Sequence, residues 1–173
     1  EEPEIKNSPV AATIAEALYA AELVPAAGGK QAAIKVAGRF VCYSFRDTQV
    51  TLPLPLGKVA VESVQLDGAA APLVAGTELN PLAILISRPG LHVVDLLFTV
   101  PVQLTGPAGV FSLNLTAVPS GLLRFKVPAG ETNFRVNGSS GAFRRVVNEA
   151  VAELLIPVAA GGAFQVSWQP RQT

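Results

Sequence analysis

The sequence predicts an all-β fold, an antiparallel β-sandwich of about 11–12 short strands. Short runs in which apolar and polar residues alternate indicate strands with one buried face. The clearest run is 110–118, where Phe111, Leu113 and Leu115 alternate with polar residues. Gly and Pro turn signals separate these runs, which is typical of strands joined by tight turns.

A second observation is a pattern that occurs twice, at 50–73 and again at 122–143. In each copy a β-like run ends in Pro-x-Gly, and a short strand ends in Asp67-Gly68 or Asn137-Gly138. Such dipeptides favour the positive φ angles of tight hairpin turns. A Gly-led strand that ends before a proline then follows each copy.

The repeat divides the chain into two related β halves, 10–105 and 106–173, which we expect to pack as one compact unit. Residues 1–9 are polar and contain prolines, so they are interpreted as an extended N-terminal arm. The chain has no methionine and a polar start, which fits either a mature secreted protein or a fragment of a longer chain.

The first segment of the first half, 12–24, fits two interpretations. Its apolar residues satisfy both helical spacing and strand alternation, and its alanines and glutamates favour helix. A strand is preferred because the segments that follow are all β-like. The next segment, 30–45, is interpreted as one long strand with a β-bulge at Gly38.

Two hairpins are expected later in the chain. The strands 79–87 and 91–100 would pair through the turn Arg88-Pro89-Gly90. In the second half, the segments 148–158 and 163–170 would form the closing hairpin.

Composition limits the class of protein. Hydrophobic residues make up 50% of the chain and charged residues only 15%, against a usual charged share of about 25%. We interpret this excess as a strand-rich core, or else as apolar surface that becomes buried in an assembly. The 13 basic and 13 acidic residues cancel, so no nucleic-acid partner is predicted. No apolar run approaches the roughly 18 residues of a spanning helix, so no transmembrane segment is predicted.

No catalytic, cofactor-binding or metal-binding residue is predicted, and the chain is expected not to be an enzyme. His92 is the only histidine, and on a strand it points to the opposite side from Asp95, so the two form no dyad. Cys42 is interpreted as a buried apolar residue. The scattered carboxylates leave a β-sandwich hydrolase as a third interpretation.

Aromatic residues are the candidates for ligand contact. Trp168, Tyr19 and Tyr43 would form a sugar-stacking platform if they were exposed together. This is the alternative function, a carbohydrate-binding module. The competing interpretation of Trp168 is that it closes the core from the last strand.

The order of these strands resembles that of modules in large secreted or envelope-anchored bacterial proteins. The resemblance rests on 52–57, 65–68, 90–101 and 162–170. It implies a scaffold that has no catalytic residues, secreted or located in the cell envelope. The expected function is therefore a structural or protein-interaction module, which binds a protein partner or a second copy through an apolar face or a strand edge.

Overall fold

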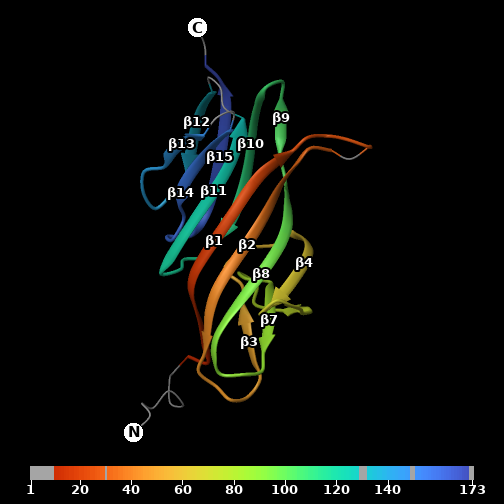
Figure 1. Cartoon of the computed structure of the whole chain (residues 1–173), viewed down its shortest axis with the longest axis vertical. Helices are drawn as coiled ribbons and strands as arrows, with labels where there is room; N and C mark the ends of the chain where they lie inside the picture. The colour runs from red at the N-terminus through yellow and green to blue at the C-terminus, as the bar shows by residue number, and fades with distance from the viewer. Residues whose placement is uncertain (1–9, 30, 129–131, 149–150, 172–173) are drawn as a thin grey trace.

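The computed structural model describes residues 10–29, 31–128, 132–148 and 151–171, and these form strands and no helix (Figure 1). The prediction of an all-β fold is confirmed. No helix in this part of the chain has the length and apolar character needed to cross a membrane. Residues 1–9, interpreted as an extended arm, lie outside the described residues. The strands are β1 (Ala12–Val24), β2 (Ala33–Ser44), β3 (Val50–Pro53), β4 (Ala60–Leu66), β5 (Ala69–Ala70), β6 (Leu73–Ala75), β7 (Leu82–Ile86), β8 (Gly90–Pro101), β9 (Gln103–Thr105), β10 (Ala108–Leu115), β11 (Ser120–Pro128), β12 (Thr132–Asn137), β13 (Arg144–Asn148), β14 (Val151–Pro157) and β15 (Gly162–Pro170).

The strands form three sheets. The largest has eight strands in the order β13-β14-β11-β1-β2-β8-β4-β5, and two smaller sheets have the orders β12-β15-β10-β9 and β3-β7-β6. Buried side chains from all three sheets belong to one hydrophobic core. Phe111 on β10 and Phe125 on β11 meet across this core with ring centroids 5.2 Å apart. The small sheets therefore pack against the large one as in a sandwich.

The strand pairings repeat between the two halves of the chain. In the first half the pairings run β1-β2-β8-β4, and in the second they run β9-β10-β15-β12. The remaining strands give β3-β7-β6 in the first half and β11-β14-β13 in the second. All these pairs are antiparallel, so each half is built on the same plan. This plan supports the interpretation of two related halves and begins its second copy at β9, slightly before residue 106.

The two halves are joined by a parallel pair of strands, β1 and β11. Through this pair the β11-β14-β13 sheet of the second half continues the β1-β2-β8-β4 sheet of the first (Figure 1). A purely antiparallel sandwich was the expectation, and this pair is the exception to it. Because β1 bonds to β2 on its other side, it lies near the middle of the eight-stranded sheet.

The ambiguous segment 12–24 is a strand, as preferred from the sequence. Its residues Ala17, Tyr19 and Ala21 face the core, while the residues between them face outward. In the β1–β2 pair the register shift of a β-bulge lies in β1, between Ile14 and Glu16, and not at Gly38 as expected. Gly38 is opposite Tyr19 in a regular register, and a Cβ there would lie 3.3 Å from the Phe40 ring. The absence of a side chain at Gly38 leaves room for the neighbouring aromatic rings.

The Asp67-Gly68 turn is confirmed, because both residues have positive φ angles, 51° and 84°, and join β4 to β5. The predictions of the two later hairpins were wrong. The turn Arg88-Pro89-Gly90 carries the chain from β7 in one sheet to β8 in another, and β14 and β15 likewise belong to different sheets. Asn137-Gly138 closes no hairpin either, since β12 pairs with β15 and β13 pairs with β14.

Candidate functional site

The three aromatic residues predicted as a stacking platform lie apart. Tyr19 faces the core, is only 3% exposed, and packs edge-on against Phe40. Tyr43 lies near the end of β2 on the opposite, outward side of the sheet, against Phe45. Trp168 is on β15 of the four-stranded sheet. None of the three rings contacts another of them in the described residues, so they form no common platform.

Trp168 covers one end of the core. Its ring is 5.5 Å from that of Phe125 and 6.3 Å from that of Phe111, measured between centroids. The ring also lies directly on Gly109 of the neighbouring β10, where an added Cβ would overlap it. Trp168 therefore serves packing between β10, β11 and β15.

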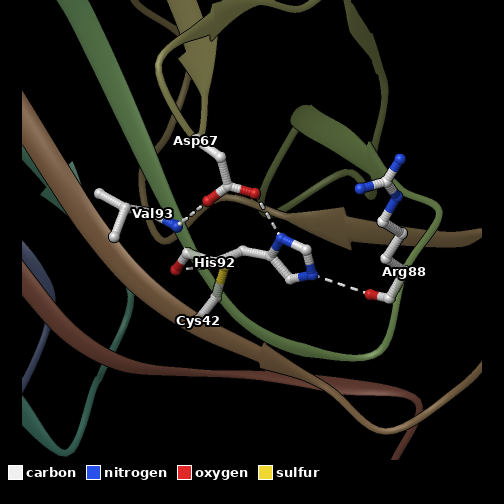
Figure 2. Close-up of polar contacts among 5 residues, drawn as sticks. All are labelled: Cys42, Asp67, Arg88, His92 and Val93. Carbon is white, nitrogen blue, oxygen red and sulfur yellow. Dashed lines mark hydrogen bonds and ion pairs between the residues drawn. The ribbon is translucent and has the colours of Figure 1, made fainter.

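The only histidine lies in a polar cluster that the sequence did not indicate (Figure 2). His92 Nδ1 is 2.6 Å from Asp67 Oδ2, and His92 Nε2 is 2.8 Å from the carbonyl oxygen of Arg88. The second carboxylate oxygen of Asp67 accepts a hydrogen bond from the backbone N–H of Val93 at 2.9 Å. The cluster ties the β4–β5 turn to the beginning of β8.

Both partners of His92 are oxygen atoms. The backbone carbonyl of Arg88 only accepts hydrogen bonds, so Nε2 donates to it, and Nδ1 lies against the carboxylate of Asp67. Burial raises the pKa of Asp67, but its hydrogen bonds from His92 and Val93, and the charge of His92, together lower that pKa below its usual 3.8. Each ring nitrogen of His92 thus lies within hydrogen-bond distance of an oxygen atom, and neither is free for proton transfer to a substrate.

Cys42 lies beside this cluster on β2, with its Sγ 3.5 Å from the carbonyl oxygen of His92. It is fully buried, and burial and the charge of Asp67 raise its pKa to about 11. A thiol in this state is a poor nucleophile. The described residues contain no group of three or more His, Cys, Asp and Glu side chains that would hold a metal ion.

The outward-facing side of the eight-stranded sheet carries a different arrangement, which we call the outer face. We define it by three rows of side chains that run across β14, β11, β1, β2 and β8 in register. The charged row is Glu153, Lys126, Glu22, Lys35 and Thr99; the central row is Leu155, Arg124, Ala20, Ala37 and Leu97; the leucine row is Pro157, Leu122, Leu18, Arg39 and Asp95.

The outer face is hollowed at its centre. Two open hollows of about 340 and 480 Å³ share Ala20, Ala37 and Arg124 in their walls. They arise because the central row carries alanines on β1 and β2, whereas the rows on either side carry longer side chains. Leu18, at the rim, is an apolar side chain that is 36% exposed.

The charges of the outer face are only partly paired within the chain. Ion pairs join Lys35 to Glu62 at 3.8 Å, Arg39 to Asp95 at 2.9 Å, and Arg124 to Glu153 at 3.6 Å. Glu22 and Lys126 are neighbours on β1 and β11, yet neither makes an ion pair with any described residue. These two charges are therefore open to a partner.

The hydrolase interpretation finds little support on this surface. Glu22 and Glu153 line the same hollow, but they stand on one side of a single sheet with β11 between them. Two strand spacings put them about 10 Å apart, with Lys126 in the same row between them. They do not face one another across a cleft, as a glycosidase pair does.

No protein-family model matches the chain, and no curated protein sequence matches it. Its fold is similar to parts of larger solved structures. An M1 zinc metallopeptidase from Deinococcus radiodurans has a TM-score of 0.52 and 13% identity over 92% of this chain and 42% of its own. A two-domain M1 zinc metallopeptidase bound to L-tryptophan has a TM-score of 0.54 and 14% identity, covering 92% and 43%. Yeast LTA4 hydrolase in complex with bestatin has a TM-score of 0.52 and 11% identity, covering 91% and 28%. At this identity the similarity shows the fold alone, and the chain spans less than half the length of each of these proteins.

Proposed function

We propose that the chain is a non-enzymatic protein-interaction module that binds a folded protein through the outer face of its eight-stranded sheet. The observation that carries the proposal is the hollow around Ala20 and Ala37, which is bordered by Glu22 and Lys126, two charges that have no ion pair among the described residues. Protein interfaces commonly combine an apolar centre with a polar rim. An open sheet face with this arrangement suits another protein surface better than a small molecule, which requires a more enclosed cavity.

The state of the reactive residues supports a role without catalysis. Both ring nitrogens of His92 are hydrogen-bonded, and the thiol of Cys42 is buried and protonated. The similar solved structures are chains more than twice as long, and one is described as having two domains. By analogy, the module would lie against a further folded domain. The setting we propose is a bacterial secreted or cell-envelope assembly, which rests on the sequence resemblance.

Site-specific photo-crosslinking in the cells that make the protein tests this proposal. A photoreactive amino acid at Ala37 would lie inside the hollow, and the same residue at Leu79, which is 75% exposed between β6 and β7, is the control. We expect a discrete protein adduct from position 37 and none from position 79. Absence of any adduct from position 37 would overturn the proposal.

A further inference from the structure

We propose that the outer face is complementary to itself and binds a second copy of this chain, related by a two-fold axis parallel to the strands and passing between β1 and β11. This inference rests on the proposed function and identifies the protein that the outer face binds as a second copy of the chain. Such an axis places β11 of one copy opposite β1 of the other, and β14 opposite β2. Each row of the outer face then meets the same row of the second copy, as in an isologous dimer.

The charged row is the strongest argument for this axis. Its charges alternate along Glu153, Lys126, Glu22 and Lys35, from β14 to β2. The axis reverses this order in the second copy, so Lys126 meets Glu22 and Glu153 meets Lys35. Every charge of the row then has an opposite charge across the interface. Glu22 and Lys126, which have no ion pair in the described part of a single chain, would each gain one.

The central row is complementary in size. The same axis places Arg124 of one copy opposite Ala20 of the other, and Leu155 opposite Ala37. The long side chains of β11 and β14 thus lie over the hollow that the two alanines leave in β1 and β2. Filling this hollow would remove water from the alanines and from the aliphatic stem of Arg124.

The leucine row adds an apolar contact. Leu18 and Leu122 are neighbours on β1 and β11, directly beside the axis, so Leu18 of one copy meets Leu122 of the other. Packed sheets cross at about 30°, which shifts the outer strands most. The contacts of β1 and β11 lie nearest to the axis and are therefore the ones that determine the pairing.

The size of the surface sets the expected strength of the dimer. Five strands about 4.8 Å apart and three rows about 7 Å apart give roughly 400–500 Å² for each copy. A stable interface of standard size buries about 800 Å² for each partner. We therefore expect a weak dimer, with a dissociation constant of about 10 μM or more, that responds strongly to charge reversal and to salt.

Analytical ultracentrifugation of two charge-reversal variants tests the inference. Lys126→Glu places glutamate opposite Glu22, and Glu22→Lys places lysine opposite Lys126, so each variant alone should lose at least tenfold in self-association. Mixed in equal amounts, the two variants should associate again, because both contacts then join opposite charges. The matched controls are Lys58→Glu and Glu78→Lys, which reverse exposed charges elsewhere and should leave the dimer unchanged.

Each outcome decides the inference. A mixture that stays monomeric, or single variants that dimerise as the natural chain does, would overturn this axis. A natural chain that is monomeric at 1 mM would overturn the dimer itself, while the proposed docking function would still be supported if position 37 crosslinks to a different protein. Both substitutions are at exposed positions, and a thermal unfolding curve of each variant checks that the fold is kept.

Discussion

Asp67 and His92, 25 positions apart in the sequence, form a hydrogen-bonded pair with 2.6 Å between Oδ2 and Nδ1 (Figure 2). Asp67 occupies the first position of the β4–β5 turn with a positive φ, so the turn geometry and the ion pair depend on the same residue. The side chain of Asp67 is 48% exposed, whereas that of His92 is 8% exposed. The pair thus links an exposed turn to the buried side chain of His92 near the start of β8.

Asp67→Asn should weaken the fold in a pH-dependent way. Asparagine tolerates the positive φ of the turn, so the change removes mainly the charge. Because the pKa of Asp67 is lowered in the folded chain, its contribution is present above its ordinary value of 3.8 and is lost as the pH falls through the folded value. At pH 7 we expect a loss of about 1 kcal/mol at most, given the exposure of Asp67, or a Tm lower by about 2–4 °C.

Thermal unfolding of both proteins between pH 2 and pH 7 measures this effect. The gap between the two Tm values should be present above the ordinary pKa of 3.8 and should close as the pH falls through the lower pKa that Asp67 has in the folded chain. Asp47→Asn, at an exposed position, is the control and should show no such gap. A gap that is independent of pH would show that Asp67 acts through the turn alone.

Two glycines with the same φ angle should respond differently to alanine. Gly68 and Gly138 both have a φ of 84°, which an alanine adopts only at a cost of about 1 kcal/mol. A Cβ at Gly68 would meet open space, whereas at Gly138 it would overlap the carbonyl oxygen of Ala163. Gly138→Ala should therefore lower the urea midpoint clearly more than Gly68→Ala does. Equal decreases in the urea midpoint would mean that the 138–143 connection shifts to accept the Cβ without a free-energy cost.

Gly109→Ala should displace Trp168. An added Cβ would overlap the indole ring, which also packs against Phe111 and Phe125. We expect a loss of about 1–3 kcal/mol, as in other overpacked cores. Trp168 is the only tryptophan, so its fluorescence maximum should move to longer wavelength as the ring becomes more exposed. The control is Gly141→Ala, where the nearest atom to a Cβ is 3.6 Å away, and both readouts should stay unchanged.

Strand positions and the turn at Asp67 were predictable because both depend on local patterns. Alternation identifies the buried face of a strand such as β10, and Asp-Gly favours positive φ. Strand partners were not predictable in the same way. The turn Arg88-Pro89-Gly90 shows that the chain reverses, but in a sandwich the next strand can enter the opposite sheet, as β8 does.

The candidate surface was beyond sequence reasoning for a related reason. The alternation of β1 and β11 shows which residues face outward, but the rows across the sheet depend on a parallel pairing between segments about 100 positions apart. Only that register places Glu22 beside Lys126 and Ala20 beside Arg124. The contact between His92 and Asp67 was missed for the same reason, because the two residues are 25 positions apart and meet only through the pairing of β4 with β8.

Cys42 should be unreactive in the folded chain. It is fully buried on β2, and its pKa of about 11 leaves about one thiol in a thousand ionised at pH 8. A thiol reagent such as DTNB should therefore label it only as fast as the strand opens, but immediately in urea. Thr48→Cys adds an exposed thiol in the same chain as an internal control. One equivalent of thiol should then react within seconds and the second slowly. Rapid labelling of both thiols would mean that β2 opens readily beside His92, and that the His92 cluster does not keep this end of the sheet closed.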